Sequence, residues 1–190
     1  MEQKKAMLKN EIFTVPNILV FIRVLLVPVF VALYIQNEFY WAFGVMATAF
    51  LTDFLDGKIA RKFNCITDLG KTIDPIADKI YQFAVALCLI VKYPLIISVA
   101  IVLFIKEISM GVMGLILLSK GGKVFGAKWY GKLSTAVLDI SMVFLLVTPL
   151  FSLNISPKVT DIIIYVCNAV LIFSAVMYTR LYIGKIKELD

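Results

Sequence analysis

Charged residues are scarce in this chain of 190 residues: they make up 17% of it, whereas hydrophobic residues make up 61%. Soluble domains usually contain about 25% charged and about 45–50% apolar residues. The composition therefore excludes an ordinary soluble domain, a disordered chain and a nucleic-acid-binding tail. It predicts an integral membrane protein that has no room for a further soluble domain of normal size.

Histidine is absent, and there are only three cysteines. Cys65, Cys88 and Cys167 lie far apart, and two of them fall inside apolar stretches, where a thiol packs as a small apolar group. Neither histidine nor paired cysteine is present to favour zinc. We expect all three thiols to be structural.

The apolar residues are gathered into six long runs. Because about 20 apolar residues cross a bilayer as a helix, and open sheets leave backbone groups unpaired in lipid, we expect an all-α integral membrane protein with six transmembrane helices. Residues 1–14 suit a short N-terminal interfacial helix or a basic tail. We expect one membrane domain over 1–190, with an uncleaved first span. The predicted spans are 17–36, 40–57 with a cytoplasmic extension, 74–91, 94–119, 130–151 and 159–183.

Most of the 19 lysines and arginines lie near the two ends of the chain and in the loops 57–73 and 119–133, whereas the opposite connections hold Lys92 and Lys158. Cytoplasmic loops are rich in lysine and arginine. We therefore expect both termini and both long loops to lie in the cytoplasm, with Trp129 and Tyr130 in an aromatic belt at that interface.

Three other cations, Arg23, Lys79 and Lys106, lie within or at the edges of predicted spans. A charge at such a position is costly and is usually functional.

Four aspartates lie where the second predicted span ends and the third begins. Asp53 and Asp56 are three residues apart, and Asp74 and Asp78 are four apart, so each pair lies on one face of a helix. If the loop between the helices makes them antiparallel, the two faces meet. Four hard oxygen ligands suit Mg²⁺ or Mn²⁺. The simpler alternative is that these carboxylates pair with neighbouring lysines and arginines at the interface.

Small residues surround the aspartates. Gly57, Ala60 and Gly70 leave the backbone nearly bare on that side. A bulky phosphorylated ligand needs such a surface for close approach.

These residues form the string Asp53-x-x-Asp56-Gly57-x-x-Ala60-Arg61, followed after eight residues by Gly70-x-x-x-Asp74-x-x-x-Asp78. The string resembles the signature of the CDP-alcohol phosphotransferases, integral membrane enzymes of phospholipid synthesis. The resemblance implies a six-helix bundle of that family, a homodimer, and a place in the bacterial cell membrane.

The same resemblance implies the roles of the site residues. Two divalent cations, Mg²⁺ or Mn²⁺, are bound by Asp53, Asp56, Asp74 and Asp78. Catalysis is assigned to Asp78, as general base, and to Asp74. The cytidine diphosphate part of the donor is bound by Gly57, Ala60, Arg61 and Gly70.

The stretch from Asp74 to Lys79, and Val15-Pro16-Asn17 with Arg23 and Pro28, are similar to the phosphatidylglycerophosphate synthase and cardiolipin synthase branches of this family. This similarity implies transfer of a phosphatidyl group from CDP-diacylglycerol to glycerol 3-phosphate. Phosphatidylglycerol is the main alternative acceptor, and a serine-type or inositol-type acceptor ranks lower.

An acceptor that carries a phosphate needs cations near the carboxylates. Lys106 and Lys132, with the hydroxyl of Ser134 or Thr135, are candidates for binding it. Alternatively, Lys106 forms an internal ion pair with Glu107 or Asp139. The alternative for Lys132 is a cytoplasmic positive charge with no role in binding the acceptor. The role of Asp139 itself stays open among an ion pair, a structural acceptor and a polar group of the acceptor cavity.

A cation transporter is the competing class of function. Transporter sites lie near the bilayer midplane, often on broken helices in repeated halves. The four aspartates instead cluster at one predicted cytoplasmic edge, and we see no internal repeat. Their position therefore favours the enzyme.

Overall fold

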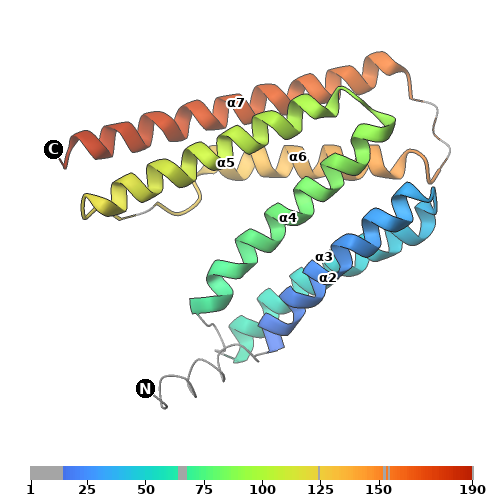
Figure 1. Ribbon diagram of the computed structural model, residues 1–190, viewed down its shortest axis with the longest axis horizontal. Coiled ribbons are helices and arrows are strands. Elements are labelled where there is room, and N and C mark those ends of the chain that lie inside the picture. Colours follow the sequence, from blue (N-terminus) through green and yellow to red (C-terminus); the bar gives the residue numbers. More distant parts are fainter. Residues whose placement is uncertain (1–14, 64–67, 124, 152, 154, 190) are drawn as a thin grey trace. The chain divides into compact units, whose positions relative to one another are not determined.

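The computed structural model describes residues 15–63, 68–123, 125–151, 153 and 155–189, without the side chains of 15–17, 53–63 and 68–75. The described chain is helical (Figure 1). Its helices are α2 (Val15–Ile35), α3 (Phe39–Phe63), α4 (Asp68–Lys92), α5 (Ile96–Ser119), α6 (Trp129–Val147) and α7 (Pro157–Lys187).

Four of these helices contain apolar stretches long enough to cross a membrane: Ile18–Ile35 of α2, and the whole of α5, α6 and α7. Among the described residues, α3 adds the shorter apolar stretch Phe39–Thr52. The expected all-helical integral membrane fold is confirmed. The interfacial helix expected over residues 1–14 lies outside the described residues.

Several helices run past the apolar spans. α3 continues beyond residue 57 to Phe63, which agrees with the cytoplasmic extension expected for the second span, whereas α4 begins at Asp68 rather than at the expected residue 74, and α7 continues to Lys187 rather than to residue 183. Hydropathy marks where the apolar part of a helix ends, but the backbone continues as a helix through good helix formers such as Ala60, Arg61 and Lys62. The signature residues 53–61 therefore all lie on α3.

One helix ends earlier than predicted. α6 stops at Val147 rather than near residue 151, because Pro149 has no N–H to donate to the carbonyl of Leu145. The hydroxyl of Thr148 donates to that carbonyl oxygen instead, at 2.8 Å. The buried carbonyl is thereby satisfied.

The chain forms two compact units, Met1–Cys88 and Leu89–Asp190. In the first unit α2 and α3 pack side by side (Figure 1). The buried residues of α3 recur every three or four positions as Ala42, Met46 and Ala49. The two alanines are small residues, which allow membrane helices to approach closely. The predicted single domain over 1–190 stays a prediction.

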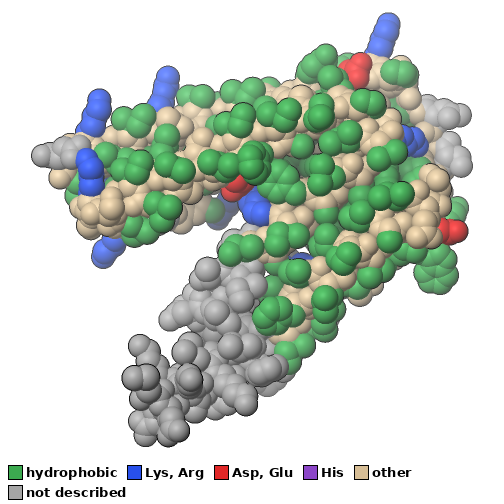
Figure 2. Space-filling view, viewed as in Figure 1, with side chains coloured by type: hydrophobic (Ala, Val, Ile, Leu, Met, Phe, Trp, Pro, Cys, Tyr) green, Lys and Arg blue, Asp and Glu red, His purple; other side chains and the backbone are tan. Residues whose placement is uncertain are grey.

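In the second unit α5 and α6 both pack against α7. The buried positions of α7 form one face of the helix: Thr160, Ile164, Cys167, Leu171, Ser174, Tyr178 and Tyr182. Apolar side chains cover much of the visible outer surface (Figure 2), as lipid contact requires. Cys88 of the first unit and Cys167 are buried free thiols, as expected for cysteines that pack as small apolar groups, and Cys65 lies outside the described residues.

The loop from α5 to α6 begins in a C-terminal capping motif. Gly121 has a positive φ of 79°. Its N–H donates to Leu118, and the N–H of Gly122 donates to Leu117, both at 2.9 Å. This pair of hydrogen bonds is the Schellman arrangement, in which glycine adopts the left-handed conformation without a steric penalty. Gly121 therefore terminates α5.

The aromatic belt expected at the start of α6 is only half correct. Trp129 is 63% exposed, as a belt residue would be, but Tyr130 is only 6% exposed. The Tyr130 ring packs edge-on against Tyr178 of α7, with ring centroids 4.7 Å apart. Tyr130 therefore belongs to the core of the second unit.

Candidate active site

Asp78 is the one aspartate of the signature whose side chain falls among the described residues. It lies on α4, and its Oδ1 accepts a hydrogen bond from Nη1 of Arg23 on α2 at 2.8 Å. The two partners differ in burial: the side chain of Arg23 is 3% exposed and that of Asp78 is 53% exposed. The Asp78 side chain thus contacts a buried cation while about half of its surface stays exposed.

The other signature positions are known by their helices alone. Asp53, Asp56, Gly57, Ala60 and Arg61 lie on α3, and Gly70 and Asp74 lie on α4. Their side chains lie outside the described residues. The helical backbone supports the expectation that each pair of aspartates shares one helix face, because residues three or four apart are neighbours on a helix. The metal and cytidine diphosphate sites built from these side chains stay predictions.

The residue after Asp78 is also held in place. Nζ of Lys79 donates to Oε1 of Gln82, one turn further along α4, at 3.3 Å. Gln82 is only 8% exposed. Ala77, on the other side of Asp78, is 1% exposed. Asp78 is therefore an exposed side chain on a segment of α4 whose neighbours Ala77 and Gln82 are buried.

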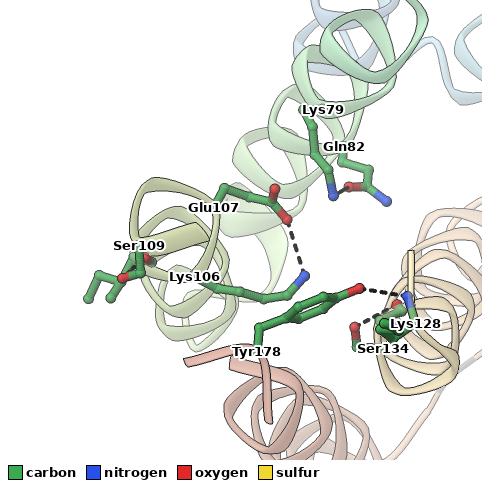
Figure 3. A network of polar contacts seen from close by, with 10 residues as sticks. Lys79, Gln82, Lys106, Glu107, Ser109, Lys128, Ser134 and Tyr178 are labelled. Atoms are coloured by element: carbon green, nitrogen blue, oxygen red, sulfur yellow. Dashed lines mark hydrogen bonds and ion pairs between the residues drawn. The ribbon is translucent and has the colours of Figure 1, made fainter. Parts of the chain in front are cut away.

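Lys106 on α5 is buried at 4% exposure, and its Nζ lies 3.1 Å from Oε1 of Glu107 (Figure 3). This is the internal ion pair that the sequence left open as an alternative. A buried lysine in an apolar helix requires such compensation. The ion pair explains how a lysine can be buried in this apolar helix. A role for Lys106 in binding the acceptor stays a prediction.

The remaining candidate acceptor residues lie on α6. Lys132 is exposed. Ser134 is 1% exposed, and its hydroxyl donates to the carbonyl oxygen of Gly131 in the same helix at 2.9 Å. The hydroxyl proton of Ser134 is thus used within α6. Asp139 is exposed on the same helix.

Tyr178 was not among the candidate residues of the sequence. The backbone N–H of Lys128 donates to Oη of Tyr178 at 3.0 Å (Figure 3). A Cβ atom at Gly131 would lie 2.3 Å from the same oxygen. Glycine at 131 therefore lets α7 come close to the first turn of α6, which carries Lys132.

The comparison with protein-family models decides which family this site belongs to. The model described as CDP-alcohol phosphatidyltransferase matches residues 13–181, a range that includes all four aspartates of the signature. The chain belongs to the CDP-alcohol phosphatidyltransferase family. The resemblance expected from the aspartate string is thereby confirmed.

Individual relatives within this family support the match. A Streptomyces coelicolor protein named cardiolipin synthase (CMP-forming) is 33% identical over 145 residues, which are 73% of this chain and 67% of the relative. A Rickettsia typhi protein named CDP-diacylglycerol–glycerol-3-phosphate 3-phosphatidyltransferase is 42% identical over 80 residues, 40% of this chain and 45% of the relative. An Aquifex aeolicus protein of the same name is 28% identical over 167 residues, 87% and 93% of the two chains.

Members of the CDP-alcohol phosphatidyltransferase family in general depend on divalent metal. The ligand set of this chain fits such an ion, because the four signature positions are all carboxylates, which are hard oxygen ligands. Asp78 also has the exposure that a ligand needs, since about half of its side chain is open.

Proposed function

We propose that this protein transfers the phosphatidyl group of CDP-diacylglycerol to a hydroxyl group of glycerol 3-phosphate, which gives phosphatidylglycerophosphate and CMP. The observation that carries this proposal is the family match over residues 13–181, with the complete aspartate signature inside it. The Rickettsia and Aquifex relatives, whose names state this reaction, support the choice of acceptor.

The reaction replaces one bond to phosphorus by another. The acceptor hydroxyl oxygen bonds to the phosphorus of the phosphatidyl group, the bond from that phosphorus to the oxygen of the CMP phosphate breaks, and the hydroxyl proton goes to a base. The four aspartates would bind two divalent cations, Mg²⁺ or Mn²⁺. These cations would neutralise the negative charge of the diphosphate.

The chain's own residues then have distinct tasks. Asp78 accepts the hydroxyl proton as general base, and Asp74, four positions earlier on α4, shares the catalytic role. Arg61 binds diphosphate oxygens through its planar guanidinium group. Gly57, Ala60 and Gly70 leave space for the cytidine diphosphate part of the donor.

The phosphate of the acceptor is assigned to Lys106 and Lys132, with Ser134 nearby in the sequence. Lys106 is the strongest of the three, because a cation buried in an apolar helix is costly and usually functional. Its Nζ contacts Oε1 of Glu107 at 3.1 Å, which holds the side chain in one orientation.

Cardiolipin synthesis is the second candidate function. The relative from Streptomyces coelicolor, named for that reaction, covers a large part of this chain. The two candidates differ in the charge of the acceptor: glycerol 3-phosphate has a phosphomonoester with nearly two negative charges, whereas phosphatidylglycerol has a phosphodiester with one. A site with two lysines favours the former.

The active site and both ends of the chain are assigned to the cytoplasm of a bacterial cell. Within the second unit, exposed lysines gather where α5 and α7 end, including Lys120, Lys123 and Lys187 (Figure 2). Cytoplasmic ends of membrane helices are rich in such residues. We also propose that the protein is a homodimer. Light scattering of the detergent-solubilised protein, which measures the mass of the complex, would test this.

The deciding experiment follows CMP release by purified protein with CDP-diacylglycerol, Mg²⁺ or Mn²⁺, and one acceptor at a time. We expect release with glycerol 3-phosphate and none above background for the Asp78→Asn variant. If no acceptor gives more CMP than this variant, the transferase proposal fails. Preference for phosphatidylglycerol would instead select cardiolipin synthesis.

A further inference from the structure

The ion pair between Arg23 and Asp78 joins α2 to α4, and its two residues are 55 positions apart in the sequence. Arg23 is the only charged residue in the sequence of α2, and its side chain is 3% exposed. Arginine cannot lose its proton in a protein, so its charge must be compensated where it lies. An apolar residue would fill this position at a lower cost. The presence of arginine therefore calls for a reason.

The surroundings of the pair keep it in place. Ala77, next to Asp78, is 1% exposed. The rings of Phe30 on α2 and Tyr81 on α4, one turn beyond Asp78, lie 6.0 Å apart between centroids. The ion pair therefore has a second contact between α2 and α4 near it.

The burial of the two partners is unequal, and this points to a function. A pair that only joined two helices would be expected to bury both groups. Here the cation is buried and about half of the carboxylate remains open. The charge-assisted hydrogen bond of 2.8 Å from a buried donor favours one orientation of this half-exposed aspartate.

We propose that Arg23 is a positioning residue: from its buried place on α2 it fixes the orientation of the Asp78 carboxylate for binding a divalent cation. The proposal rests on the proposed function, in which Asp78 is a metal ligand. Groups that orient a metal ligand by a hydrogen bond typically contribute about 10–100-fold to metal affinity or activity. Arg23 is such a group for Asp78.

The test measures Mn²⁺ binding directly, from the electron paramagnetic resonance signal of free Mn²⁺ added to purified protein without substrate. Arg23→Met removes the charge and keeps an apolar side chain, and Arg23→Lys keeps the charge without the planar group. Tyr93→Phe is the control: it removes another hydrogen bond between residues 55 positions apart, the one between the hydroxyl groups of Tyr93 and Thr148 at 2.6 Å, in the other unit. Thermal unfolding of each metal-free variant is recorded in parallel.

We expect Arg23→Met to weaken Mn²⁺ binding by about 10–100-fold, Arg23→Lys to lie between it and the native protein, and Tyr93→Phe to bind Mn²⁺ normally. In the CMP assay Arg23→Lys should need more Mn²⁺ for half-maximal rate. If Arg23→Met does not yield folded protein, the Mn²⁺ affinity of Arg23→Lys decides, and native affinity overturns the proposal.

Two further outcomes would overturn the inference. Native Mn²⁺ affinity with lower thermal stability in Arg23→Met would make Arg23 a packing residue. Tighter Mn²⁺ binding would mean that Arg23 competes with the cation for the carboxylate. Failure of the proposed function gives a different result. In that case Asp78→Asn would bind Mn²⁺ and release CMP to the same extent as the native protein, independently of the results for the Arg23 variants.

Discussion

Replacing Gly131 by alanine is expected to destabilise the second unit, although alanine is the better helix former by about 1 kcal/mol. Gly131 lies in the first turn of α6 and is buried. A Cβ atom there would lie 2.3 Å from Oη, 2.9 Å from Cε2 and 3.0 Å from Cζ of Tyr178. All three distances are too short for non-bonded atoms, so the ring of Tyr178 must move.

The ring has little room for that movement. Tyr178 is 4% exposed, and it is packed against Tyr130 at a centroid distance of 4.7 Å. Moving it also breaks the hydrogen bond from the N–H of Lys128, worth about 0.5–1.5 kcal/mol. Overpacking a well-filled core costs about 1–3 kcal/mol. After the gain in helix propensity, we expect a net loss of about 1–3 kcal/mol in the free energy of unfolding.

The assay is thermal unfolding of the purified protein in detergent, with Gly111→Ala as the matched control. Gly111 also lies in a helix, but a Cβ atom there would have nothing within 4 Å. Its replacement should raise the unfolding temperature, whereas Gly131→Ala should lower it by about 2–4 °C for each kcal/mol lost. An equal rise in both variants would refute the close approach of α6 and α7 at Gly131.

The remaining predictions concern the reaction. Lys106→Ala should raise KM for glycerol 3-phosphate by about 10-fold or more, since hydrogen bonds to charged groups contribute about 1.5–3 kcal/mol, while KM for CDP-diacylglycerol changes little. An unchanged KM for glycerol 3-phosphate would leave Lys106 only its ion pair with Glu107. Removal of divalent metal by chelation should abolish CMP release, and Mg²⁺ or Mn²⁺ should restore it. Full activity in excess chelator would contradict metal-dependent transfer.

The helices were predictable because hydrophobic runs of membrane length leave the backbone few alternatives. All six predicted spans correspond to helices, and the errors lie at the ends, where hydropathy is the wrong measure. Gly70 was placed in the loop before the third span, yet α4 begins at Asp68 and carries it in a helix, whereas residues 57–61 lie on the expected extension of α3. The early end of α6 at Val147 followed from the missing N–H of Pro149, which an apolar count ignores.

The contacts of the candidate site were less accessible to sequence reasoning. The partner of Lys106 was among the alternatives because Glu107 is adjacent to it. The partner of Arg23 was not, since Asp78 lies 55 positions away and only the packing of α2 against α4 brings the two together. Tyr130 was misplaced for the same reason: its neighbour in the core, Tyr178, is distant in sequence. Composition predicts that an intramembrane charge needs a partner, but tertiary structure selects which one.

This difference between the two ion pairs bears on how the site is assembled. Lys106 and Glu107 are neighbours in one helix, so their pair can form before the helix packs against anything. The pair of Arg23 and Asp78 can form only when α2 lies against α4. Before that contact a cation in α2 lacks this carboxylate, and Asp78 lacks its buried donor, so both groups favour the packed arrangement. The interhelical pair therefore couples the packing of the first unit to the orientation of a signature aspartate.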